Sequence, residues 1–106
     1  WKADLLQCTG DPVCVIRSRK TYTNFEFVCE WRHLKDAGNS GIFVWSPSES
    51  LDRLDGPGYP EGIEVQVLDL GYEENWLESK GVHSNWFTSH GDVFPVGASN
   101  LLTISA

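Results

Sequence analysis

Carboxylate and amide side chains alternate with apolar ones in the stretch "GIEVQVLD", residues 62–69. Residues two apart in a strand share a face, so Glu64 and Gln66 lie side by side. The opposite face carries three apolar side chains, those of Ile63, Val65 and Val67. A carboxylate beside an amide gives a possible carboxylate-bearing groove, but the pattern alone does not reach a reaction. On a convex outer face these polar groups are merely solvated, and on a concave face they line a groove; both interpretations stay open.

Asp69 completes this stretch and would fall on the apolar face if the strand continued that far. We expect the strand to end before it. A second stretch, "AGNSGIFVW" at residues 37–45, places a small polar turn directly before an apolar strand. Asn, Ser and Gly tolerate tight turns, so local physics favours an ordinary hairpin turn. The functional alternative is that Asn39 points its amide into a groove beside Glu64.

A third group of candidates lies in "GVHSNWFTSHGDVF", which contains His83, His90 and Asp92. A histidine can take or give a proton near neutral pH. His90 and Asp92 are two apart, so they share a face if the chain is extended there. The spacing is not a signature of a metal site. The chain also contains no Gly-x-Ser-x-Gly nucleophile motif and no glycine-rich phosphate loop.

The elements that must position these residues are mostly strands, because apolar residues recur with period two. The pattern predicts strands over residues 13–17, 24–32, 41–45, 62–69, 85–89 and 101–105. Only "YEENWLESKG", residues 72–81, predicts a short helix, which ends at Gly81. Strands separated by frequent turn signals predict an all-β fold, an antiparallel β-sandwich.

Length and charge restrict the function further. The chain of 106 residues forms a single domain, 1–106. Its net charge of -7 is uneven, because residues 1–48 sum to +1 and residues 49–106 to -8. An acidic half repels phosphate backbones, so we expect no nucleic-acid partner, whereas sugars and cations remain open as ligands. No segment is long and apolar enough to predict a membrane span.

Three cysteines, Cys8, Cys14 and Cys29, are too few for a disulfide framework. A Cys8–Cys14 bridge is one option, and buried apolar thiols are the safer expectation. The chain has no Met and begins at Trp1, so we expect its natural start to be missing. Six strands at most make a thin sandwich, and the last one is apolar. We therefore expect the domain to be incomplete on its C-terminal side.

Several stretches together resemble one family, the 3-keto-disaccharide hydrolase domain, formerly a domain of unknown function. They are "WKADLLQCTGDP", "YTNFEFVCEWR", "GNSGIFVW", "GIEVQVLD" and "HGDVFPVGA", in the family's order and over nearly the whole chain. The resemblance implies a concanavalin A-like jelly roll. It also implies cleavage of glycosides whose sugar carries a ketone at carbon 3. Such a ketone acidifies the hydrogen on carbon 2, so a base can remove it and the glycosidic oxygen can leave.

The resemblance also implies roles for residues. Asn39 matches the Asn-Ser-Gly turn of the family. The family's Glu-x-Gln-x-x-Asp strand is matched by Glu64, Gln66 and Asp69. Glu64 is then a general base or a metal-facing carboxylate. Gln66 and Asn39 would hydrogen-bond sugar hydroxyls or the ketone, and Asp69 would brace the strand end. His90 and Asp92 are candidates for the acid, and Trp45 or Trp86 could stack on a sugar.

Alternatives from other classes remain. A non-catalytic carbohydrate-binding module on the same fold predicts exposed, coplanar Trp rings, whereas an enzyme predicts a buried carboxylate with a perturbed pKa. A purely structural or interaction sandwich is a third interpretation. A carbohydrate is the expected partner, a divalent metal is open, and no other cofactor is implied. Bacterial members of the family are often exported, which implies a periplasmic or extracellular location.

Overall fold

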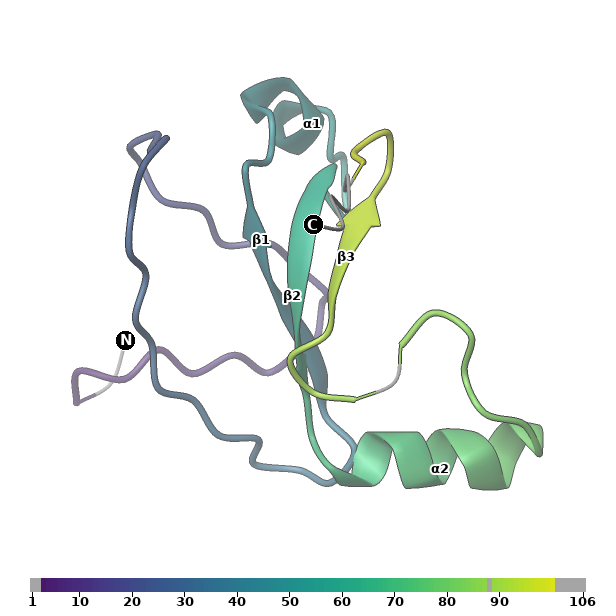
Figure 1. Ribbon diagram of the computed structural model, residues 1–106. Coiled ribbons are helices and arrows are strands. Elements are labelled where there is room, and N and C mark those ends of the chain that lie inside the picture. The colour runs from purple at the N-terminus through teal and green to yellow at the C-terminus, as the bar shows by residue number, and fades with distance from the viewer. Residues whose placement is uncertain (1–2, 88, 101–106) are drawn as a thin grey trace.

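A central antiparallel sheet is the main feature of the computed structural model, which describes residues 3–87 and 89–100. Its strands are β1 (Asn39–Val44), β2 (Gly62–Leu68) and β3 (Val93–Val96), in the order β1-β2-β3. Two helices, α1 (Ser48–Asp52) and α2 (Gly71–Lys80), flank β2 in the sequence. Figure 1 shows residues 3–38 as long irregular loops and α2 projecting from the foot of β2. The predicted antiparallel β class is confirmed at the level of this sheet.

The strand register separates two faces, because residues directly opposite each other point the same way. The first, called the Glu64 face, carries Asn39, Gly41, Phe43, Glu64, Gln66, Leu68 and Phe94. The second, called the Val65 face, carries Ser40, Ile42, Val44, Ile63, Val65, Val67 and Val93. The alternation predicted along residues 62–68 is therefore present. The strand also ends at Leu68, so Asp69 lies beyond it as expected.

An apolar pocket of about 450 Å³ lies between the Val65 face and residues 25–31. Its lining includes Phe25, Phe27 and Trp31 from that segment, and Val65 from the sheet. The segment is not tightly packed, since Phe27 is 60% exposed and Trp31 is 50% exposed. The apolar face is therefore covered only loosely.

The predicted strands over residues 13–17 and 24–32 are wrong, because both segments are irregular. Alternation gives a segment a strand-like face, but a strand forms only when a neighbour accepts its backbone hydrogen bonds. Of the predicted strand 85–89, the described residues form bends and loop instead. The predicted strand 101–105 lies outside the described residues.

The helix α2 agrees with its prediction. It ends at Gly81, which has a φ of 72° and whose N–H donates to the carbonyl of Leu77 over 2.8 Å. Its inner side contributes two aromatic rings to a cluster of Tyr72, Trp76, Trp86, Phe87 and Phe94. Phe87 is the best buried member, with 3% exposure. This cluster joins α2 to the sheet through Phe94 of β3.

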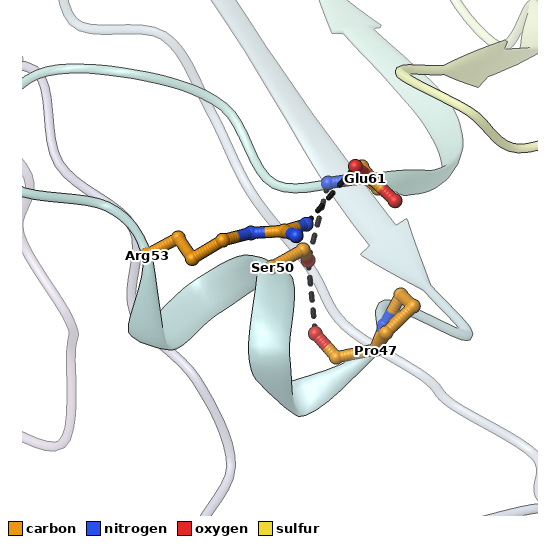
Figure 2. A network of polar contacts seen from close by, with 4 residues as sticks. All are labelled: Pro47, Ser50, Arg53 and Glu61. Atoms are coloured by element: carbon orange, nitrogen blue, oxygen red, sulfur yellow. Dashed lines mark hydrogen bonds and ion pairs between the residues drawn. The ribbon is translucent and has the colours of Figure 1, made fainter.

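The helix α1 lies in a region for which the sequence predicts neither a strand nor a helix, and a small polar network holds it (Figure 2). The buried hydroxyl of Ser50 donates to the carbonyl of Pro47 over 2.9 Å and accepts from the N–H of Glu61 over 3.2 Å. Arg53 forms an ion pair of 3.1 Å with the carboxylate of Glu61. Because Glu61 directly precedes β2, these contacts fix the start of the central strand.

The cysteines differ from both expectations. Cys8, Cys14 and Cys29 are free thiols, and all three are exposed. They lie in the irregular segment 3–38, whose described side chains are mostly exposed, so their thiols are exposed as well. Within the described ranges no helix is long and apolar enough to cross a membrane.

Candidate functional site

Glu64 lies at the centre of the sheet between two aromatic residues. On β1 it faces Phe43, and on β3 it faces Phe94, so the three side chains form one row on the Glu64 face. The carboxylate makes no hydrogen bond or ion pair with the described residues. Partial burial disfavours the charged form and raises the pKa of Glu64 above its usual value. A carboxylate in this state is a better proton acceptor than an exposed one.

Gly41 determines where the Glu64 carboxylate lies. A Cβ on Gly41 would collide with the carboxylate of Glu64, so the side chain of Glu64 extends over the bare backbone of this glycine. Gly41 is in turn directly opposite Gln66 in the register. The carboxylate therefore leans along the sheet toward the residue pair formed by Gly41 and Gln66.

The side-chain amides of Gln66 and Asn39 lie on the same face of the sheet as Glu64. Nε2 of Gln66 donates a hydrogen bond of 2.7 Å to Oδ1 of Asn39. Gln66 is only 1% exposed, and its Oε1 is buried without a hydrogen-bond partner in the described residues. Asn39 is exposed, and its own NH₂ group has no acceptor among those residues. Asn39 thus offers two N–H donors to an incoming ligand, while Gln66 holds it from below.

Asp69 clamps the ends of two elements. Its Oδ1 accepts hydrogen bonds of 3.0 Å from the N–H of Ala37, before β1, and from the N–H of Gly71, at the start of α2. These two hydrogen bonds, with the nearby charge of His33, lower the pKa of Asp69 below its usual value. The geometry is that of a brace at the strand end.

The sequence profile of the 3-keto-alpha-glucoside-1,2-lyase-like domain matches residues 3–105. The chain belongs to this family. The resemblance inferred from the sequence is therefore confirmed. No curated protein and no solved structure matches the chain.

In this lyase-like domain, His90 lies in a turn with Gly91, which has a φ of 90°, and Asp92 follows this turn directly before β3. The ring of His90 packs on Trp31 at 5.0 Å between centroids, and His90 lines the pocket at the Val65 face. Oδ2 of Asp92 accepts from the N–H of Ser89 over 3.2 Å. The chain is not extended here, so the condition under which the two side chains share a face is not met. His90 lies on the opposite side of the sheet from Glu64.

The two candidate tryptophans, Trp45 and Trp86, lie in different parts of the structure. Nε1 of Trp45 donates to the carbonyl of Thr23 over 3.3 Å, and the ring lies 6.0 Å from that of Phe25. Trp45 thus contacts the N-terminal segment. Trp86 is 41% exposed and meets Phe94 edge-on at 6.1 Å. Because Phe94 faces Glu64 in the register, Trp86 is the tryptophan on the side of the carboxylate.

The described residues of the domain contain no group of three or more His, Cys, Asp or Glu that could hold a metal ion. Sequence reasoning missed three residues at the site: Gly41, which makes room for the carboxylate, Phe94, which flanks it, and His33. The "NSG" motif was the signal for Gly41, and the alternation in "VFPV" was the signal for Phe94. Nothing in the local pattern singles out His33.

Proposed function

We propose that this lyase-like domain cleaves 3-keto-glycosides, with Glu64 as the base that removes the proton on carbon 2. The observation that carries the proposal is the Glu64 carboxylate, which is unpaired among the described residues, partly buried and flanked by Phe43 and Phe94. General bases are tuned in this way, because desolvation raises the proton affinity of a carboxylate. The family description supplies the substrate class.

The proposed cleavage is an elimination. Glu64 takes the proton from carbon 2, and the electron pair of that C–H bond moves into the ketone to form an enolate. The enolate then expels the oxygen on carbon 1, which takes a proton and leaves as an alcohol. The remaining sugar is an unsaturated ketone. Addition of water across its double bond gives the net hydrolysis product.

Asn39 is suited to hold the substrate during these steps. Its NH₂ group can donate to the ketone oxygen, which becomes negative in the enolate, or to a neighbouring hydroxyl. Gln66 fixes Asn39 through the 2.7 Å hydrogen bond, so the donor is placed before the substrate arrives. In this assignment Gln66 acts on the sugar through Asn39 rather than by direct contact.

The acid that protonates the leaving oxygen is assigned to Asp92 rather than His90. The backbone of Asp92 is bonded to Gln66, since the N–H of Gln66 donates to the carbonyl of Asp92 over 2.8 Å. His90, by contrast, packs on Trp31 at the Val65 face. A substrate bound over Glu64 would have the sheet between itself and His90.

The binding-module alternative is less well supported. It requires coplanar, exposed Trp rings, and Trp86 meets its neighbours at steep angles of 71° to Phe87 and 82° to Trp76. Trp86 can still form an edge of the sugar site. We further propose that the complete domain is a concanavalin-like jelly roll, in which more strands cover the sheet, and that it acts in the periplasm or outside the cell.

The proposal is tested by incubating the protein with 3-keto derivatives of aryl glucosides, with and without chelator. Release of the phenol, together with ultraviolet absorbance of an unsaturated ketone, supports the elimination. Loss of release with chelator would add a metal to the mechanism. Sugar binding by calorimetry without any release would overturn the enzyme and support a binding module.

A further inference from the structure

The turn immediately before Asn39 is held more firmly than a surface turn requires. The carboxylate of Asp69 accepts from the N–H of Ala37 over 3.0 Å, and the N–H of Asp69 donates to the carbonyl of Gly38 over 2.9 Å. Ala37 itself has a φ of 56°, a conformation that residues other than Gly adopt rarely. The conformation of residues 37 and 38 is therefore imposed by the contacts around it.

His33 supplies the contact on the other side of this turn. Its ring occupies the space where a side chain of residue 38 would be, since a Cβ on Gly38 would collide with Nδ1 of His33. Nε2 of the same ring donates a hydrogen bond of 3.2 Å to the carbonyl of Val67 in β2. The ring is half-buried and links the turn to the central strand.

These contacts converge on Asn39, which follows Gly38 directly. The backbone of Asn39 is placed by the turn, and its side chain is placed by Nε2 of Gln66. If the turn moved, Oδ1 of Asn39 would leave Gln66, whose buried amide has no other partner in the described residues. The position of Asn39 is thus coupled to the ring of His33.

We propose that His33 is a positioning residue for Asn39 and thereby for the substrate oxygen that Asn39 holds. The kinetic part of this inference rests on the proposed function, and the structural part does not. His33 touches no substrate. It acts by fixing the turn, and a displacement of about 1 Å in a donor can cost a large factor in rate.

The test compares His33→Phe, which keeps a ring and removes Nε2, with His83→Phe as the matched control. His83 is exposed and has no hydrogen bond or ring contact among the described residues. Two readouts are taken: hydrogen exchange of the Gln66 side-chain NH₂ by NMR, and the kinetics on a 3-keto-glucoside. We expect His33→Phe to lose exchange protection at Gln66 and to lower kcat roughly tenfold with little change in KM. His83→Phe should change neither.

Gly38→Ala provides an independent variant, because it pushes the ring of His33 away without removing it. It should reproduce the effects of His33→Phe, and the double variant should add nothing to either. His33→Gln can again donate to Val67 and should restore part of the protection and rate.

Unchanged Gln66 protection in a folded His33→Phe or Gly38→Ala protein overturns the proposal. So does a fall in the melting temperature with no change in protection. If His33→Phe does not fold, Gly38→Ala decides between these outcomes. If the wild-type protein has no lyase activity, the proposed function fails, and the NMR readout still decides whether His33 positions Asn39.

Discussion

Gln66 and Asn39 are joined across β1 and β2 by a 2.7 Å hydrogen bond from an almost fully buried amide to an exposed one. The buried partner has an unsatisfied Oε1 in the described residues, which costs stability. A leucine at position 66 would avoid this cost and would leave Asn39 free to rotate. The arrangement is therefore better explained by the orientation of Asn39 than by stability.

The coupling between these two amides is measurable in a double-mutant cycle. Asn39→Ala leaves the NH₂ of Gln66 buried and unpaired, so we expect the free energy of unfolding to fall by about 1–3 kcal/mol. Adding Gln66→Leu should recover part of that loss. Ser40→Ala, on the neighbouring residue and the other face, is the control. Urea denaturation measures the wild type, the two single variants Asn39→Ala and Gln66→Leu, their double variant and the control, and strictly additive effects would contradict the coupling.

Replacing Glu64 by Gln removes the proposed base and keeps the shape of the side chain. We expect kcat/KM on a 3-keto-glucoside to fall by about 10²–10⁴-fold. The fold should survive, because Gln has no charge to desolvate, and the melting temperature at pH 7 should equal or exceed that of the wild type. Circular dichroism and leaving-group release test both statements. Unchanged turnover would exclude Glu64 as the base.

The raised pKa of Glu64 predicts the pH dependence. A base must be deprotonated, so kcat/KM should rise with pH, with its midpoint above 4.5, the ordinary value. Phe94→Ala should expose the carboxylate to water and move the midpoint down. Val93→Ala, on the Val65 face, should leave it in place. If Phe94→Ala leaves the midpoint unchanged, the ring of Phe94 is not what raises the pKa of Glu64.

Gly41→Ala tests the position of the carboxylate rather than its identity. The added methyl group would collide with the Glu64 carboxylate and turn it away from Gln66. We expect kcat to fall roughly tenfold or more, while urea denaturation detects an intact fold. The Ser40→Ala protein again serves as the matched control. Full activity in Gly41→Ala would show that the carboxylate works from another position.

The brace at Asp69 predicts a contribution to stability that depends on pH. Its pKa is lowered, chiefly by the hydrogen bond from Ala37 and then by that from Gly71. The charged carboxylate therefore stabilises the fold above its ordinary pKa of 3.8, and this contribution is lost as pH falls through the lower folded value. Asp69→Asn should be less stable than the wild type at pH 7, and the difference should shrink toward pH 2. If the stability difference between the two proteins does not change with pH, the charge of Asp69 is not its cause.

The sequence alone was sufficient to predict features that depend only on residues close together along the chain. The alternation along residues 62–68 places Glu64 and Gln66 on one face because strand geometry has period two. Gly81 ends α2 because glycine readily adopts the left-handed conformation that a helix terminus requires. The family was also recognisable from ordered short stretches, which need no contact information.

Only the tertiary structure decided which of these residues meet. The row of Phe43, Glu64 and Phe94 depends on the register between strands from distant parts of the chain, and nothing local specifies it. The turn at Gly91 sends His90 to the Val65 face, and residues 24–32 pair with no strand among the residues that the structure describes. Alternation is a local property, whereas pairing, burial and the desolvation of Glu64 arise from contacts between segments that the sequence order does not reveal.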